Sequence, residues 1–297
     1  MSSAPPSIGF LGLGNMGLPM SRRLVEAGHN VVGYDLSVQA RRRAAGFGVR
    51  EMSDVGDAVA DVELIILMLP DSDAVTAVLS DDALLGRIAP QTIVIDMSSS
   101  EPLRTRVLAG SLKLRGIRLL DAPVSGGVLG AENGKLTIMA GGDKAVLDLA
   151  RPCLEPLGTV IHTGPVGSGH AVKSLNNLLS ATHLWITSEA MLAGVRFGID
   201  PEVMLSVFNG SSGRSGSTEN KWPKFVLPGT YNSGFGLRLM VKDMGIAVQL
   251  AEEVGAPSVL GSEALELWRK AAQGLPPSAD HTEIVRWLEG EGGANDN

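Results

Sequence analysis

Short apolar runs recur through the first 165 residues, and each has the length and composition of a β-strand. The first run covers residues 7–11, and the second covers residues 30–35 and ends in an acid. Further runs of this type are 63–69, 92–96, 118–122, 136–140 and 160–162. Helix-type stretches separate the earlier runs, an alternation that is typical of parallel α/β folds.

Beyond residue 165 the strand-type runs disappear and apolar residues recur at helical spacing. The longest such segment, 171–197, ends at Gly198 in a C-cap position. The pattern predicts further helices over residues 237–254, 258–272 and 279–288. We therefore predict an α/β protein with two domains. Residues 1–165 form a Rossmann-type doubly wound sheet, and a long helix joins it to an all-α C-terminal domain of residues 166–297.

A glycine-rich loop follows the first predicted strand and precedes a segment with helical spacing. It consists of Gly12, Leu13, Gly14, Asn15, Met16 and Gly17. Strand, loop and helix start are the context that a dinucleotide-binding fingerprint requires. In such a loop Gly12 permits the tight turn, Gly14 lets the backbone approach a pyrophosphate, and Gly17 allows the helix to pack closely on the strand. We predict that these six residues bind the cofactor.

The acid that ends the second predicted strand indicates which cofactor is bound. Asp35 lies about 20 residues beyond the glycine loop, where a carboxylate binds the ribose hydroxyls of NAD and repels the extra phosphate of NADP. Leu36 offers that phosphate no donor. Arg41, Arg42 and Arg43 follow, and we interpret them as a solvated helix face. NAD is therefore the expected cofactor, with NADP less favoured.

Composition excludes several classes of protein. Of the 297 residues 44% are hydrophobic and 19% charged, as in ordinary soluble domains. The net charge of −7 argues against a nucleic-acid partner, which would favour a basic face. A single cysteine, Cys153, fits a reducing compartment. We find no signal-peptide pattern and no apolar run long enough to span a membrane, so we expect a cytoplasmic protein. The histidines lack metal-ligand spacing, and we expect no metal.

A lysine and an asparagine carry the candidate chemistry of the second half. Lys173 and Asn177 are four residues apart at the start of the long predicted helix, so they share one of its faces. They follow a glycine-punctuated turn at residues 167–169. An ammonium group and a carboxamide placed together beside a dinucleotide site indicate a dehydrogenase with a proton-handling lysine.

Four separated segments together resemble the β-hydroxyacid dehydrogenase family, which includes 3-hydroxyisobutyrate dehydrogenase, tartronate semialdehyde reductase and, more remotely, 6-phosphogluconate dehydrogenase. They are residues 12–20, 121–127, 167–177 and 242–243, and the resemblance extends over residues 7–288. It implies a Rossmann domain, an all-helical second domain and an active site in the cleft between them. It also implies a homodimer or homotetramer and a small hydroxyacid substrate.

The resemblance assigns roles to the residues of the catalytic site. Ser125, Gly126 and Gly127 match the motif that binds the substrate carboxylate, and consecutive backbone N–H groups with a hydroxyl can form such an anion nest. Lys173 matches the catalytic general acid–base of the family. Asn177 matches the asparagine that orients the substrate.

The resemblance also extends the cofactor site. Lys242 matches a lysine near the nicotinamide, although a Lys-Asp pair such as residues 242–243 is commonly a surface pair. Leu69 and Pro70 follow one apolar strand, and Ser99 follows the next. Ligands bind at the carboxyl ends of strands in open α/β sheets, which supports these three assignments. The family usually has threonine at the position of Ser99, and serine keeps the hydroxyl.

The substrate and the reaction class leave alternatives open. Segment 210–221 is long, polar and glycine-rich, and is either a solvent loop or a sign of a substrate more hydroxylated than 3-hydroxyisobutyrate. An imine or aldehyde reductase of the same fold is a second possibility, although imine reductases usually lack a lysine at the Lys173 position. A catalytically silent dinucleotide-binding module is a third.

Overall fold

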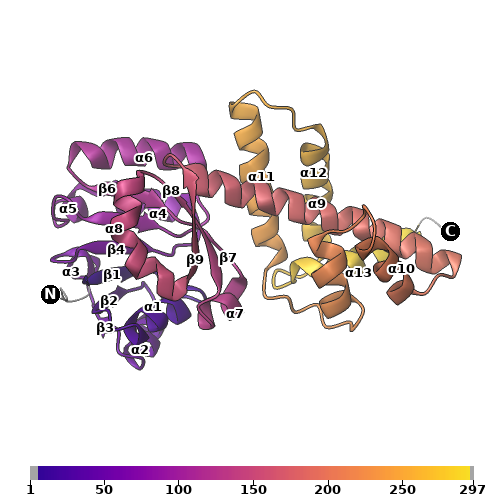
Figure 1. The fold of residues 1–297 in the computed structure, drawn as a ribbon, viewed down its shortest axis with the longest axis horizontal. Coiled ribbons are helices and arrows are strands. Elements are labelled where there is room, and N and C mark those ends of the chain that lie inside the picture. The colour runs from indigo at the N-terminus through magenta and orange to yellow at the C-terminus, as the bar shows by residue number, and fades with distance from the viewer. Residues whose placement is uncertain (1–5, 295–297) are drawn as a thin grey trace. The chain divides into compact units, whose positions relative to one another are not determined.

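The computed structural model describes residues 6–294, with side chains described to residue 290. The chain folds as two compact units, Met1–Lys173 and Ser174–Asn297. The division falls inside helix α9 (Ser168–Phe197), the long helix that the sequence predicts (Figure 1).

A nine-stranded sheet forms the centre of the first unit, with the order β3-β2-β1-β4-β5-β6-β8-β7 and β9 paired to β8. The strands are β1 (Ile8–Leu11), β2 (Val31–Tyr34), β3 (Arg50–Glu51), β4 (Leu64–Leu67), β5 (Ile93–Asp96), β6 (Arg118–Asp121), β7 (Val124–Ser125), β8 (Leu136–Gly141) and β9 (Gly158–Gly164). Strands β1 to β6 are parallel, whereas β8 is antiparallel to β6 and β7. The predicted Rossmann-type fold is confirmed, with the order reversing at β1, which lies between β2 and β4.

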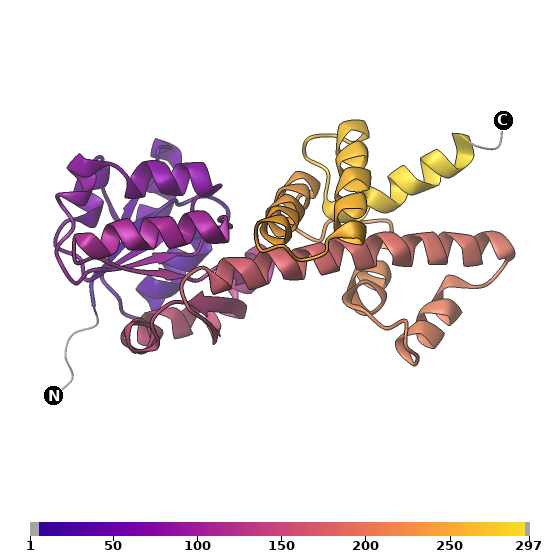
Figure 2. The same cartoon turned by 90° about the horizontal axis from the view of Figure 1, so that it is seen from above.

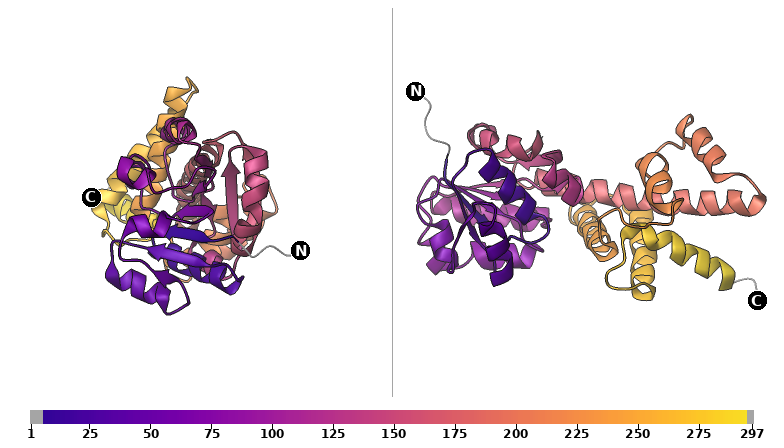
Figure 3. Two further views of the ribbon diagram at one scale, coloured as in Figure 1. Left: turned by 90° about the vertical axis from the view of Figure 1, so that its left-hand side faces the viewer. Right: turned by 90° about the horizontal axis from the view of Figure 1, so that it is seen from below.

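Side chains alternate between two apolar cores, one on each face of this sheet. Ile8 and Ile66 belong to one core, and Leu11 and Leu67 to the other. Helices cover both faces (Figure 3). They are α1 (Gly17–Glu26), α2 (Val38–Ala45), α3 (Val55–Val59), α4 (Ser72–Leu79), α5 (Asp82–Leu85), α6 (Pro102–Leu114), α7 (Gly127–Glu132), α8 (Lys144–Leu154) and the short η1 (Glu155–Leu157).

The second unit is helical, as predicted. After α9 come α10 (Pro201–Asn209), the π-helical segment η2 (Ser217–Val226), α11 (Leu237–Glu253), α12 (Val259–Gly274), η3 (His281–Glu283) and α13 (Ile284–Ala294). Helices α11 and α12 form an antiparallel pair (Figures 1 and 2). Within the described residues the only strand-type pairing of this unit is one bridge between Gly236 and Asp280. Trp185, Trp222 and Trp268 are buried in its core.

Segment 210–221 differs from the loop that its polarity suggests, because its second half is helical. Residues from Ser217 onward belong to η2, and both Ser217 and Thr218 are buried. Ser215 starts the segment, because its side-chain oxygen accepts from the backbone N–H groups of Ser217 and Thr218 at 3.2 and 3.3 Å. Polar residues that bond to nearby backbone in this way obscure the helical pattern in the sequence.

A buried carboxylate fixes the start of α9. Asp121 is fully buried at the end of β6, and its two carboxylate oxygens accept from the backbone N–H groups of Gly167 at 2.6 Å and His170 at 2.9 Å. The His170 ring is held in turn by Thr105, whose Oγ1 lies 2.9 Å from Nδ1. A negative charge at a helix N-terminus satisfies its free N–H groups and interacts favourably with the helix dipole. The helix that carries Lys173 therefore starts from a fixed point.

Candidate active site

The three glycines of the fingerprint differ in the space that a side chain would find at each position. Gly12 has φ +96°, and a Cβ there would lie 2.3 Å from the Met68 carbonyl oxygen. A Cβ on Gly17 would lie 1.8 Å from the carbonyl oxygen of Gly12, so α1 can pack on the loop only without a side chain. A Cβ on Gly14 would meet nothing within 4 Å. Gly14 therefore leaves open space beside the helix start, as a loop that receives a pyrophosphate requires.

Asp35 lies directly beyond β2 and is tied to the glycine loop. Its Oδ2 accepts from the Leu13 N–H at 2.7 Å, and its Oδ1 accepts from the Ser37 N–H at 2.7 Å. The carboxylate is therefore fixed at the strand-order reversal, where a ribose would be recognised. Leu36 is 88% exposed and offers no polar group. The residues present fit NAD.

The interpretation of the arginine run as a solvated face was wrong for Arg41. Arg42 and Arg43 are exposed, but the Arg41 side chain is only 11% exposed. Its Nη1 donates to the Asp35 carbonyl oxygen at 2.6 Å, and its Nε lies 3.4 Å from Glu51 Oε1 on β3. These two partners hold Arg41 at the sheet edge, next to Asp35, the acid that we predict to bind the ribose.

The remaining residues of the first unit that we predict to bind the cofactor lie at the carboxyl ends of neighbouring strands. Leu69 and Pro70 follow β4, and the Leu69 N–H donates to Ser98 Oγ, which follows β5, at 2.9 Å. Ser98 is fixed by Asp96, whose Oδ1 accepts its N–H at 3.0 Å. Ser99 is the next residue and is half-buried. The structure thus brings both loops to the edge of the sheet that the glycine loop occupies.

The Ser-Gly-Gly turn has a backbone that only glycine adopts readily. It joins β7 to α7, with φ +128° at Gly126 and +62° at Gly127. A Cβ on Gly127 would meet nothing within 4 Å, so its backbone is open to an approaching group. Ser125 is half-buried at the end of β7. The assignment of this turn to the substrate carboxylate stays a prediction.

Lys173 and Asn177 lie one turn apart on the same face of α9. Both are polar and both are nevertheless buried, with 7% and 6% of their surface exposed. Their neighbour Asn176 is exposed. Buried polar side chains are retained where they have partners or a function, so this face of α9 is the strongest candidate for catalysis.

A carboxylate to which we assigned no role from the sequence connects two of the predicted residues. Asn177 Nδ2 donates to Asp243 Oδ2 at 2.6 Å, and Lys242 Nζ lies 3.2 Å from Asp243 Oδ1. Asp243 is only 2% exposed, on α11. The bond fixes the rotation of the Asn177 carboxamide, whose oxygen accepts from Asn176 Nδ2 at 3.4 Å. The sequence did contain a signal for Asp243, because it follows Lys242 directly, but we assigned a role to the lysine alone.

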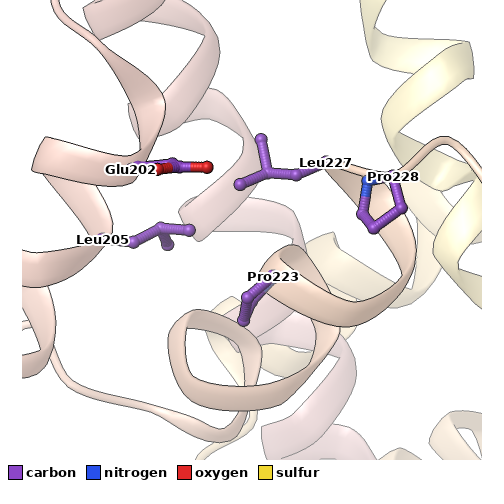
Figure 4. A pocket seen from close by; sticks show the side chains of 5 residues that line it. All are labelled: Glu202, Leu205, Pro223, Leu227 and Pro228. Atoms are coloured by element: carbon purple, nitrogen blue, oxygen red, sulfur yellow. The ribbon is translucent and has the colours of Figure 1, made fainter.

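A surface pocket of the second unit lies elsewhere. It has a volume of about 430 Å³ and is lined by Glu202, Leu205, Pro223, Leu227 and Pro228 (Figure 4). None of the predicted site residues lines it, and it offers one carboxylate among prolines and leucines. Over the described part of the chain, no group of three or more metal-ligating side chains comes together, and no helix has the length and hydropathy to cross a membrane.

Two families match consecutive parts of the chain. Residues 7–164 match the NAD binding domain of 6-phosphogluconate dehydrogenase, and residues 167–288 match the family described as NAD-binding of NADP-dependent 3-hydroxyisobutyrate dehydrogenase. Together the two matches extend over both units.

Individual relatives agree. The NAD-dependent L-serine dehydrogenase of Pseudomonas aeruginosa is 39% identical over 88% of this chain and 91% of its own. The mitochondrial 3-hydroxyisobutyrate dehydrogenase of Bos taurus is 35% identical over 98% and 89%. The structure of Mycobacterium tuberculosis 3-hydroxyisobutyrate dehydrogenase with L-serine has a TM-score of 0.91 at 35% identity, over 96% of this chain and 99% of that one. An imine reductase from Myxococcus stipitatus, 17% identical, shares the fold alone. The chain belongs to the 3-hydroxyisobutyrate dehydrogenase family of oxidoreductases.

Proposed function

We propose that the protein is an NAD-dependent dehydrogenase that interconverts a small 3-hydroxyacid and its semialdehyde or keto acid. The substrate is 3-hydroxyisobutyrate-like or more hydroxylated. Ser125, Gly126 and Gly127 bind its carboxylate, Lys173 exchanges the proton of the reacting hydroxyl, and Asn177 orients that hydroxyl. The observation that carries the proposal is the buried Lys173–Asn177 face of α9 in a chain of this family.

The cofactor is held by the first unit, with one addition from the second. The glycine loop of residues 12–17 and the N-terminus of α1 receive the pyrophosphate, and Asp35 binds the ribose. Residues 69–70 and Ser99 lie beside the glycine loop, and Lys242 is assigned to the nicotinamide. When bound, NAD⁺ supplies the acceptor for the hydride.

The residues of α9 handle the proton. Oxidation removes a hydride from the carbon that bears the hydroxyl, and the hydroxyl proton must leave with it. Lys173 Nζ, as the neutral amine, accepts this proton, and as the ammonium it returns the proton in the reverse reaction. Asn177 is uncharged and orients the substrate hydroxyl. Asp243 holds the Asn177 carboxamide in place by accepting from Nδ2 at 2.6 Å.

The test is a screen of small 3-hydroxyacids with NAD and with NADP, followed by the absorbance of the reduced nicotinamide. We expect turnover of at least one acid, with NAD preferred. No turnover of any 3-hydroxyacid with either cofactor would contradict the proposal and favour the non-catalytic module.

We also propose that the protein acts as a homodimer or homotetramer. Leu175, Leu179 and Ile186 are exposed on α9 away from the Lys173 face, and Phe197 at its end is 85% exposed. An apolar stripe of this kind on a long helix is covered in symmetric oligomers of helical domains. A cytoplasmic location stays a prediction from the sequence.

A further inference from the structure

An arginine side chain lies against the strand end that carries Asp35. Arg41 is a residue of α2, and its Nη1 donates to the Asp35 carbonyl oxygen at 2.6 Å. Its Nε donates to Glu51 Oε1 at 3.4 Å, and its guanidinium carbon lies 5.6 Å from the centroid of the Tyr34 ring. Only 11% of the Arg41 side chain is exposed, whereas its neighbour Arg42 is exposed. The guanidinium is therefore fixed beside the residue that we predict to bind the ribose of the cofactor.

Hydrogen bonds within one turn of chain set the distance between Asp35 and Arg41. Asp35 Oδ1 accepts from the Ser37 N–H at 2.7 Å, and the Ser37 side chain accepts from the Ala40 N–H at 3.2 Å. The Arg41 N–H donates to the Ser37 carbonyl oxygen at 3.1 Å. These residues all belong to the first unit, so the placement of Arg41 beside Asp35 does not depend on the second unit.

A guanidinium at this place is suited to bind a phosphate. It carries five N–H donors in a planar fork, and it binds phosphate through two parallel hydrogen bonds. In the part of the chain that the structure describes, the Asp35 carbonyl and Glu51 take two of these donors. NADP differs from NAD by a phosphate on the 2′ oxygen of the adenosine ribose, and this oxygen is the one that a carboxylate at the end of β2 binds. A group that binds phosphate therefore lies beside a group that repels it.

Glu51 adds a second carboxylate to the same edge of the sheet. It lies on the two-residue strand β3, opposite Gly33 of β2, and its side chain is 34% exposed. The charge of Arg41 is balanced by Glu51, and the charge of Asp35 remains in excess. A phosphate that approaches the ribose position therefore meets a net negative charge, although an arginine lies within the group. Removing either carboxylate would balance the charges, and removing both would leave the positive charge of Arg41 alone.

We propose that Arg41 forms a latent binding site for the 2′-phosphate of NADP, and that Glu51 is, together with Asp35, a specificity-determining residue that keeps this site closed. Asp35 places its charge where the phosphate would lie. Glu51 holds the Arg41 guanidinium in an ion pair and so weakens its attraction for a phosphate. The inference rests on the cofactor assignment of the proposed function, and it adds that two carboxylates, one of them on β3, exclude NADP.

The test is calorimetric titration of the full chain with NAD and with NADP, which needs no turnover. The readout is the ratio of the two dissociation constants, in which general damage to the loop cancels. Asp35→Ala should shift this ratio toward NADP, and adding Glu51→Gln should shift it further by about 3- to 10-fold, since a partly exposed ion pair is lost. Adding Arg41→Gln to Asp35→Ala should instead weaken NADP relative to NAD by about 10- to 100-fold, the range for charge-assisted hydrogen bonds. Arg42→Gln in the same background is the matched control, because it removes the same charge from an exposed position of α2, and it should keep the ratio within about threefold.

Three outcomes overturn the inference. They are an Arg41→Gln change that leaves the ratio of Asp35→Ala as it was, an Arg42→Gln change that alters the ratio as much as Arg41→Gln does, and a Glu51→Gln change that has no effect. The thermal midpoint of each variant is measured alongside, and should Arg41→Gln not fold, the Glu51→Gln series tests the inference with Arg41 in place. Failure of the unmodified protein to bind NAD would overturn the cofactor assignment of the proposed function. Binding of NAD with a ratio that depends on neither Arg41 nor Glu51 would overturn this inference alone.

Discussion

Replacing Asp121 with asparagine should weaken the anchor from which α9 starts. Asparagine keeps one acceptor oxygen and turns its NH₂ group toward the other backbone N–H. One of the two bonds, to Gly167 or to His170, is then lost in a fully buried site. A hydrogen bond to a charged group contributes about 1.5–3 kcal/mol, and an unsatisfied buried N–H costs about 1–3 kcal/mol. Together the two contributions lead us to expect that Asp121→Asn lowers the free energy of unfolding by about 2.5–6 kcal/mol.

The assay is urea unfolding followed by circular dichroism and by tryptophan fluorescence, since the tryptophans lie in the second unit. The two probes show whether the two units unfold together. A single free energy of unfolding is defined only if they do. Asp148→Asn is the control, because Asp148 is exposed and its ion pairs are with Lys144 and Arg151 on its own helix, and it should leave the midpoint unchanged. An Asp121→Asn midpoint equal to that of the unmodified protein would refute the anchor, because the two bonds would then contribute nothing.

Further predictions concern the cofactor, the fold and pH. NAD should be preferred over NADP by at least about tenfold in kcat/KM, and Asp35→Ala should narrow this gap; equal turnover with NADP in the unmodified protein would contradict the assignment. Gly17→Ala should abolish NAD binding by calorimetry, because a Cβ there meets the Gly12 carbonyl oxygen at 1.8 Å, and retained affinity would show that the loop can shift. Burial and the Lys221 charge lower the pKa of His281 to about 4, so its unfolded form binds more protons between that value and about 6.5. The free energy of unfolding should therefore fall as pH drops through this window, and it should fall less steeply in His281→Gln. An equal dependence on pH in the two proteins would show that His281 does not cause the loss of stability. Light scattering at micromolar protein should show a dimer or tetramer, and a monomer would contradict the oligomer.

Local physics explains which parts were predictable from the sequence. The glycine loop was recognisable because the steric demands at Gly12 and Gly17 arise between a strand, a turn and a helix that are adjacent in sequence. Lys173 and Asn177 were recognisable because residues at i and i+4 on a helix lie on the same face. The parallel sheet was predictable because apolar strand-type runs alternate with helical segments along the chain.

Partners from distant segments could not be predicted in this way. Asp243 is 66 residues from Asn177, and no local pattern joins them. Arg41 is drawn off its expected solvated face by Glu51, a residue of a two-residue strand too short to leave a signal. Lys221 lies in a segment whose serines and glycines are typical of a loop, so its contact with Ser180 on α9 required the structure.

The central claim is that Lys173 transfers the proton, and turnover by Lys173→Ala tests it most directly. With the best 3-hydroxyacid, kcat should fall by about 10²–10⁴, the usual loss for a general acid–base group. The dissociation constant for NAD should stay within about twofold, because no cofactor contact is assigned to Lys173, and Lys173→Arg should be similarly inactive because a guanidinium keeps its proton. Near-full turnover by Lys173→Ala would contradict the account and reduce Lys173 to a structural residue of α9.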